Sequence, residues 1–331
     1  MKPATIYDVA RVAGVSHQTV TRYLRGSNAV RPETGERVAA AVEQLDYRPN
    51  AAARLLRSRH SNRIGLLADR IDANGPGSIL AAASAFAHAR GYVLDVVVTD
   101  GTSPGSVVSS LQVLTEHQVA GIVALANTEV VVAEIRRQQI GVPLVVASEL
   151  GAQGDSPSTS ELAGIVAAEH LLELGHRRVG YLAGPEMWLA SQGRAGGFSR
   201  EFVRGGGEVA WMLHGDWTPE SGYDLWSGLD AEQKGITAVA AASDSMAIGL
   251  IAAATDEGVD VPSELSVIGT DDLPEVKYVR PSLSTVAMDF EQEGRVLMDA
   301  LLTSIEGVVG VPIAAPTAPY VIARDSTARR K

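Results

Sequence analysis

The sequence predicts an α/β protein in which a small helical domain precedes two doubly wound parallel-sheet subdomains. Residues 1–50 place apolar side chains at helical spacing, and the rest of the chain alternates short β-rich runs with helical runs. That alternation restarts after a Gly/Ser/Asp-rich stretch at residues 151–160. With 331 residues the chain is also longer than one hydrophobic core usually serves, so several compact units are expected.

Charge is divided unevenly along the chain. The formal net charge is −11, but residues 1–63 carry eleven basic and five acidic side chains, so this segment has a charge of +6 and the remainder −17. A phosphate backbone attracts a basic surface and repels an acidic one. We therefore expect only the N-terminal end of the chain to contact nucleic acid.

Composition excludes several classes of site. The chain has no cysteine, which rules out disulfides and thiolate metal sites, and its seven histidines show no metal-ligand spacing. Neither a metal nor another cofactor is expected. The N-terminus lacks the apolar run of a secretory signal, and no later segment reaches the ~20 apolar residues of a membrane span. We expect a cytoplasmic protein without a membrane partner.

The first expected helix follows Thr5. Ile6, Val9, Ala10 and Ala13 fall on one helical face. Thr5 with Asp8 three residues later forms a capping-box-like start, and Gly14 can take the left-handed conformation that ends a helix.

A second short helix is expected near residues 17–25, with Ser16 as its N-cap and Val20 and Leu24 facing inward. Its outward face is polar and consists of His17, Gln18, Thr21, Arg22 and Arg25. Two short helices joined by A-G-V-S favour a helix-turn-helix whose second helix enters the major groove of DNA. A plain helical hairpin with a solvated face is the alternative.

A third helix should begin at Pro32 and close a small core with Val38, Ala41, Val42 and Leu45. Residues 51–59 have high helix propensity but almost no apolar face, so this segment is not expected to fold alone.

Beyond residue 62 the alternating runs have the spacing of βαβ units, which form parallel sheets. In the first half they are residues 64–67, 79–89, 93–98, 107–114, 121–125, 130–137 and 144–147. In the second half we expect a helix at 161–174 and strands at 178–182, 236–242 and 265–269.

Three motifs resemble the LacI/GalR family of transcriptional regulators: T-I-Y-D-V-A, A-G-V-S-H-Q-T-V-T-R and L-D-Y-R-P-N-A-A-A-R-L-L. The resemblance implies a helix-turn-helix headpiece at 1–50, a hinge helix and linker at 51–61, and an effector-binding and dimerisation core of the periplasmic-binding-protein type at 62–331. It also implies chain crossovers. Residues 62–160 and 289–317 would form one subdomain, and residues 161–288 and 318–331 the other.

By this resemblance His17 and Gln18 occupy leading base-reading positions and Arg22 reads a further base. A glutamine can bond an adenine edge and an arginine a guanine edge. Leu56 in the hinge helix would wedge between bases in the minor groove. The full set of expected DNA contacts is Ile6, Tyr7, Ser16, His17, Gln18, Thr19, Thr21, Arg22, Thr34, Tyr47, Asn50, Ala53 and Leu56.

Polar residues follow several of the expected strands, where open α/β sheets bind ligands. Asp69, Ser148, Ser243 and Asp271 hold such positions, and Arg194 is expected to open a helix. The resemblance implies that Arg194 and Asp271 hold sugar hydroxyls, because these groups donate and accept hydrogen bonds, while an indole face covers the C–H side of the ring. The expected effector site is Asp69, Ile79, Ser148, Arg194, Trp217, Ser243, Asp271 and Phe290.

The expected function is that of a homodimeric repressor that binds a near-palindromic operator and is released by a galactoside-like sugar. A family member that senses another sugar or a nucleobase is one alternative. A sugar-binding transport protein is another, although it would have no use for the headpiece. An enzyme is not expected, since the chain has no G-x-S-x-G elbow, no P-loop and no G-x-G-x-x-G after its first strand.

Overall fold

The computed structural model of the chain describes residues 4–24, 30–47, 61–147, 157–307 and 316–330. The chain divides into two compact units, residues 1–61 and 62–331. In the described ranges, no helix combines the length and the apolar character that crossing a membrane requires.

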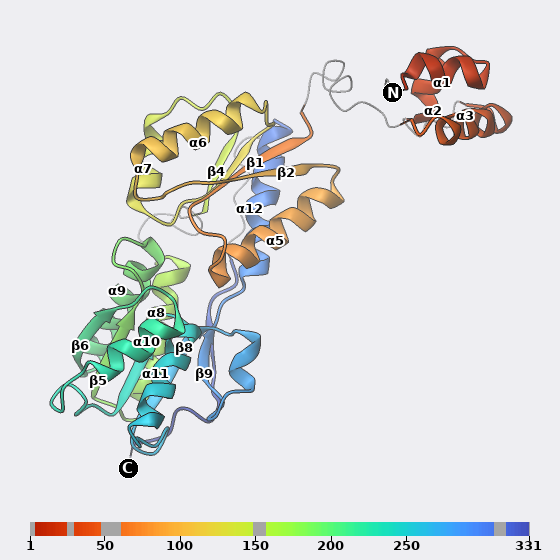
Figure 1. Cartoon of the computed structure of the whole chain (residues 1–331). Helices are drawn as coiled ribbons and strands as arrows, with labels where there is room; N and C mark the ends of the chain where they lie inside the picture. The colour runs from red at the N-terminus through yellow and green to blue at the C-terminus, as the bar shows by residue number, and fades with distance from the viewer. Residues whose placement is uncertain (1–3, 25–29, 48–60, 148–156, 308–315, 331) are drawn as a thin grey trace. The chain divides into compact units, whose positions relative to one another are not determined.

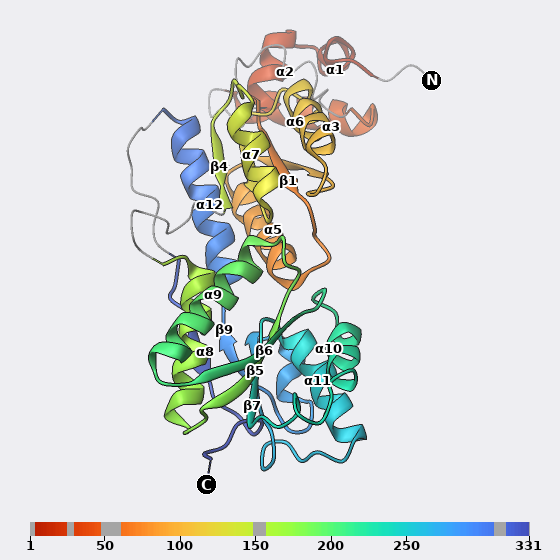
Figure 2. The ribbon, with the colours of Figure 1, turned by 90° about the vertical axis from the view of Figure 1, so that its left-hand side faces the viewer.

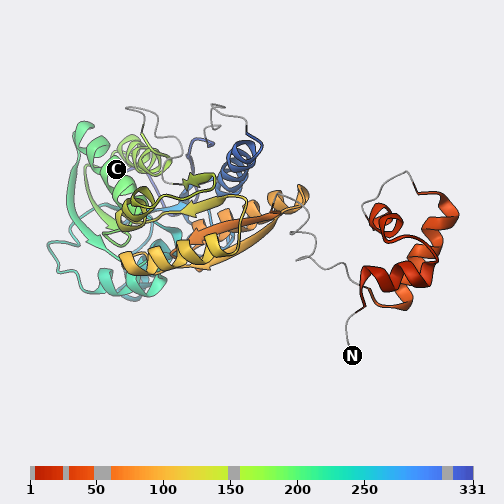
Figure 3. The same cartoon turned by 90° about the horizontal axis from the view of Figure 1, so that it is seen from above.

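The first unit contains the three expected helices, α1 (Ile6–Ala13), α2 (His17–Leu24) and α3 (Pro32–Gln44) (Figure 3). Their shared core consists of Val9, Ala10, Ala13, Val20, Val38 and Ala41. The spacing of apolar residues therefore predicted this core correctly.

Local capping fixes the ends of α1 and the start of α2. The Thr5 hydroxyl accepts from the Asp8 backbone N–H, while the Asp8 carboxylate accepts from the Thr5 N–H at 2.9 Å. Gly14 has a φ of 63°, the left-handed conformation that glycine adopts without steric cost. The Ser16 Oγ then accepts from the Thr19 N–H at 3.2 Å, which caps α2. The tight turn between the two helices follows from these few local bonds.

The second unit begins with a four-stranded parallel sheet in the order β2-β1-β3-β4. Its strands are β1 (Arg63–Ala68), β2 (Val93–Val98), β3 (Ile122–Leu125) and β4 (Leu144–Val146). Helices α5 (Asn74–Ala89) and α12 (Phe290–Ile305) pack on one face, against Ile64 and Leu66. Helices α6 (Pro104–Glu116) and α7 (Glu129–Arg137) pack on the other face, against Leu67. Both faces are covered, as in doubly wound folds.

A six-stranded sheet follows in the order β10-β9-β8-β7-β5-β6, in which only the β10–β9 pair is antiparallel. Its strands are β5 (Arg178–Ala183), β6 (Glu208–His214), β7 (Ala238–Ala241), β8 (Ser266–Asp271), β9 (Ser284–Ala287) and β10 (Tyr320–Ile322). The elements that cover it are α8 (Thr159–Glu173), α9 (Leu189–Arg204), α10 (Pro219–Ser227), α11 (Asp244–Asp256) and the short helix η2 (Pro274–Lys277). Figure 2 shows α8 and α9 on one side of this sheet and α10 and α11 on the other.

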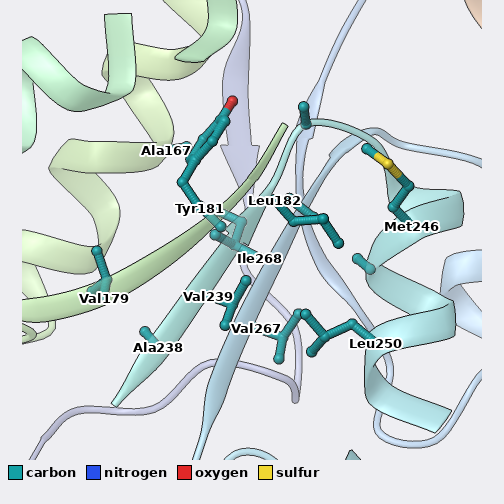
Figure 4. Close-up of a cluster of buried hydrophobic side chains, with 14 of the residues drawn as sticks. Ala167, Val179, Tyr181, Leu182, Ala238, Val239, Met246, Leu250, Val267 and Ile268 are labelled. Carbon is teal, nitrogen blue, oxygen red and sulfur yellow. The ribbon is translucent and has the colours of Figure 1, made fainter. Parts of the chain in front are cut away.

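The core of the second sheet extends over both faces. In Figure 4, Tyr181 and Leu182 on β5 point to opposite sides, Tyr181 beside Ala167 of α8 and Leu182 toward α11. All three side chains are almost fully buried. Side chains that alternate along a strand thus hold one helical layer on each face of the sheet.

The chain passes between the two sheets more than once. After β9 it returns to the first sheet as α12, which lies beside α5 (Figure 1). It then comes back to the second sheet as β10, which pairs with β9. Helix α12 therefore completes the covering of the first sheet, and β10 forms an edge of the second sheet.

Two sequence expectations need correction. Arg194 does not open its helix, because α9 begins at Leu189. The preceding Gly193 also lies inside the helix, where an added Cβ would be 3.1 Å from the Cβ of Ser160. Strand β8 also extends to Asp271 rather than ending at Gly269, so Asp271 is the last residue of the strand.

Glycines set the distance between α8 and α9. A Cβ at Gly197 would overlap the backbone of Glu161 in α8, and a Cβ at Gly164 in α8 would overlap the carbonyl oxygen of Arg194. The two helices therefore touch backbone to backbone, which fixes the position from which Arg194 extends.

Gly197→Ala should consequently destabilise the core by about 1–3 kcal/mol or more, since a methyl group must force two helix backbones apart. Gly196→Ala is the matched control on the same helix, because the nearest atom to its new Cβ would be the flexible end of Arg200 at 3.7 Å. Urea unfolding of both variants checks the difference. Equal stability of the two would contradict the close packing.

Candidate functional site

A cleft of about 1030 Å³ lies in the second unit and takes residues from both sheets and the helices that follow their strands. Arg194, Trp217, Ser243 and Asp271 line it from the second sheet, and residues 125–127, α5 and α12 line it from the first. Because ligands of open α/β sheets bind beyond the carboxyl ends of the strands, this cleft is the candidate effector site.

An ion pair between Arg194 and Asp271 forms the polar centre of the cleft. Arg194 Nη2 lies 2.9 Å from Asp271 Oδ1, and the two side chains are only 6% and 9% exposed. Arg194 Nη1 also donates to the carbonyl oxygen of Ala242, just after β7. One side chain from α9 therefore binds groups at the ends of β7 and β8. Burial raises the pKa of Asp271, and Arg194 opposes that shift.

Side chains from neighbouring segments stabilise the backbone conformation at Asp271. Asp271 and Asp272 have φ values of 119° and 55°, which side-chain-bearing residues rarely adopt. Arg324 Nη2 binds Asp272 Oδ1 at 2.6 Å, and the buried Asp244 accepts from the Leu273 N–H at 2.8 Å. Burial, together with the charge of Asp271, raises the pKa of Asp244 to about 7. These bonds hold the strained turn that directs Asp271 into the cleft.

Trp217 forms an apolar wall beside this pair. Its ring centroid lies 5.9 Å from the Arg194 guanidinium carbon and 5.7 Å from the ring of Trp188, and its φ is 75°. Asp216 fixes the loop by accepting from the Thr218 N–H at 2.9 Å, and Thr218 in turn caps α10. Within the described chain, the buried Trp217 Nε1 and Arg194 Nε have no hydrogen-bond acceptor. Two donors are therefore left for a ligand or water.

The other residues of the expected effector site differ in position. Ile79 and Phe290 line the cleft as expected. Ser243 also lines it, but its hydroxyl caps α11 by accepting from the Met246 N–H at 3.3 Å. Asp69 accepts from the Asn127 side chain, and of these two it is Asn127 that lines the cleft. Ser148 lies outside the described residues.

Glu293 lines the cleft but was not expected from the sequence. It lies three residues after Phe290 on α12, so helical spacing places the two on the same face. Burial raises the pKa of Glu293 to about 7, and Arg194 opposes that shift. Trp188 and Asn127 are further lining residues that the prediction did not include.

The headpiece presents a polar face on α2. His17, Gln18 and Arg22 are exposed, and so are Tyr7 and Ser16 nearby. The Tyr7 ring is tilted against the His17 ring, with their centroids 5.3 Å apart. Five further members of the expected set are partly buried: Ile6, Thr19, Thr21, Thr34 and Tyr47. Asn50, Ala53, Leu56 and Arg25 lie outside the described residues, as does most of the expected hinge.

The raised pKa of Glu293 predicts a pH effect on stability. The folded state favours the protonated acid, so between its usual pKa of 4.5 and about 7 the free energy of unfolding falls as pH rises. Glu293→Gln removes this contribution, so its melting temperature relative to wild type should rise from pH 5 to pH 8. Glu291→Gln, on the exposed side of the same helix, should show no such trend. A constant offset for Glu293→Gln would rule out the shifted pKa.

Comparison with known proteins agrees with this geometry. Residues 5–50 match the family model described as bacterial regulatory proteins, lacI family, and residues 168–327 match a periplasmic binding protein-like domain. Among solved structures, the chain resembles the lac repressor dimer bound to operator and the anti-inducer ONPF, with a TM-score of 0.89, 28% identity, and coverage of 99% of this chain and 100% of that one. A complex of the regulator CelR with cellobiose has a TM-score of 0.71 and 25% identity, over 98% of this chain and 99% of that one. These matches confirm the expected fold class.

Curated relatives give the same result. The HTH-type transcriptional repressor PurR of Serratia proteamaculans is 32% identical over 315 residues, 91% of this chain and 90% of that protein. The lactose operon repressor of Escherichia coli is 29% identical over 310 residues, 93% of this chain and 86% of that protein. The chain therefore belongs to the LacI family of bacterial regulatory proteins, and it is a DNA-binding transcriptional regulator rather than an enzyme.

Proposed function

We propose that this regulator is a repressor that binds a near-palindromic operator as a homodimer and releases it when a small sugar enters the cleft. The observation that carries the sugar assignment is the buried Arg194–Asp271 pair beside the Trp217 indole. A guanidinium can donate to ring hydroxyls and a carboxylate can accept from them, while an indole covers the C–H face of a sugar ring. The unpaired Arg194 Nε and Trp217 Nε1 add donors at the same place.

DNA recognition is assigned to α2. Gln18 and Arg22 are exposed on this helix, and both side chains can bond base edges in the major groove. The family match over residues 5–50 supports this role and argues against a transport protein. The tilted Tyr7–His17 ring pair would place one further aromatic surface beside the leading end of the helix.

A second chain is proposed to pack on β2 and α5. Strand β2 is an edge strand, and Val96 and Val98 are 40% and 53% exposed on the same strand face as Leu94. A groove of about 460 Å³ runs beside them, lined among others by Leu80, Ser84 and His88 of α5. An exposed apolar edge of this kind favours association.

Release of DNA requires a ligand that binds two states of the protein with different affinities. On the rim of the cleft the two sheets are joined by backbone contacts: Leu189 N–H donates to the Asn127 carbonyl at 2.8 Å, and Thr128 forms a β-bridge with Trp188. A sugar held by Arg194 and by residues of α5 or α12 would bias how the two sheets meet at this rim. Induction is the proposed direction, and a sugar that tightened operator binding would overturn it.

A nucleobase effector is the second candidate. Three aromatic side chains line the cleft, Trp188, Trp217 and Phe290, and flat bases stack on such rings. The Arg194–Asp271 pair at the strand ends can donate to and accept from several ring hydroxyls, so it favours a sugar over a base.

A thermal-shift screen with galactosides, glucosides, their free sugars and purines tests the effector class, since a ligand that binds only the folded state raises the melting temperature. We expect a sugar to raise it. Asp271→Asn should lower the affinity for that sugar about 10- to 100-fold while operator binding persists. Asp224→Asn, at an exposed position of α10, is the control. A shift with a purine alone would replace the sugar by a base.

Gln18→Ala should relax base preference at one position of each half-site, at a cost of about 1–3 kcal/mol for the preferred base. Gln44→Ala, at the exposed end of α3, should leave the preference unchanged. Selection of operators from a random library by each purified variant measures the effect. An unchanged preference profile for Gln18→Ala would remove this residue from base reading.

Val96→Asp should weaken self-association at least ~10-fold, because an unpaired carboxylate would be buried between the chains. Val203→Asp makes the same change at a valine that is 60% exposed on α9 and should leave association intact. Sedimentation equilibrium of both variants distinguishes the two surfaces. Dissociation by Val203→Asp alone would move the interface to the second sheet.

A further inference from the structure

We propose that the cleft selects an effector that carries a cationic amino group, and that Glu293 is the residue that binds this group. The inference rests on the proposed function, because it takes the effector to be a sugar and specifies which kind.

Glu293 is fixed in the cleft by the packing of its helix. Its neighbour Gly294 touches α5 so closely that a Cβ there would overlap the carbonyl oxygen of Ile79. The first turn of α12 therefore packs directly against α5, with no room for a side chain at this position. Ile79, Phe290 and Glu293, from the helices that cover the first sheet, all line the cavity that Arg194 also lines.

The charged side chains that line the cleft differ in whether they have a partner. Arg194 is paired with Asp271 at 2.9 Å, and Arg70 is paired with Asp72 through two bonds of 2.8 and 2.9 Å. Among the described residues, none donates a hydrogen bond to Glu293 or forms an ion pair with it, whereas the buried Asp244 has both Thr285 and the Leu273 N–H as donors. Of the carboxyls that line the cleft, Glu293 and the exposed Glu129 have no hydrogen-bond or ion-pair partner among the described residues, and Glu293 is the less exposed of the two.

A cationic ligand group would supply that partner. Burial makes the charged form of a carboxyl unfavourable, which is why the pKa of Glu293 is raised to about 7, and the charge of Arg194 opposes this shift. An ammonium group beside Glu293 would restore the ionised form and make a charge-assisted bond, roughly twice as strong as one from a neutral hydroxyl. A neutral ligand would leave the carboxyl without this compensation.

An amino sugar fits both ends of the cleft. Its ring hydroxyls can bond Asp271 and Arg194, and its C–H face can lie against Trp217. The protonated amine then projects toward α12. N-acetylation removes the positive charge but keeps the nitrogen, so the acetylated sugar is a neutral counterpart of the same ring.

The test uses the full-length protein at pH 7 and three sets of probes: glucose, glucosamine and N-acetylglucosamine, the corresponding galactose series, and the mannose series. Thermal shift identifies binding, and isothermal titration measures the affinities. We expect at least one amino sugar to bind about 10- to 100-fold more tightly than both of its neutral counterparts. In Glu293→Gln this preference should disappear, and in Glu291→Gln, whose carboxyl is exposed on the same helix, it should persist.

The outcomes separate this inference from the proposed function. Neutral sugars that bind as tightly as the amino sugars would refute the inference and leave the sugar effector standing. A preference that survives in Glu293→Gln would refute the role of this residue. Binding of no sugar in any series would overturn the sugar assignment itself, and the inference with it.

Discussion

The ion pair between Arg194 and Asp271 is the interaction on which the organisation of the cleft depends. Two opposite charges that are almost fully buried are tolerated only when they meet each other or other polar groups. Arg194 reaches the ends of β7 and β8 from α9, and α9 is held in place by its close contact with α8. Asp271 reaches the same point through a strained turn that Asp244 and Arg324 support. The close packing of α8 on α9 positions Arg194, and the bonds of Asp244 and Arg324 position Asp271, so both support the same ion pair.

Local features could be predicted from the sequence because short-range physics determines them. The capping box at Thr5, the left-handed Gly14 and the spacing of Val9, Ala13 and Val38 specify the headpiece without information from elsewhere. Asp271 and Ser243, which were selected for their positions at strand ends, both line the cleft. The headpiece features depend on residues a few positions apart, and the strand-end positions follow a general rule of sheet geometry.

Features that depend on distant packing were missed. Glu293 lies within a helix, and it faces the cleft only because α12 returns to pack on α5. Asn127 lines the cleft where Asp69 was expected, since the carboxylate of Asp69 is bound by that same side chain. The return of residues 318–331 to the second subdomain was expected from the family resemblance alone, because the three-residue strand β10 is too short to show a pattern of its own and depends on its pairing with β9. Only the helical spacing of Glu293 from Phe290 offered a local signal, and Asn127 had none.

The return of α12 to the first sheet has a consequence for biosynthesis. Leu297, Met298 and Leu301 cover an apolar face of that sheet, and they follow its last strand by about 150 residues. During translation the first four strands leave the ribosome with that face covered only by α5, and it stays so until nearly the whole chain has been made. At typical elongation rates of ~5–20 residues per second, this interval lasts on the order of ten seconds or more. The nascent protein therefore has a period of vulnerability to aggregation that an uninterrupted arrangement of the two subdomains would avoid.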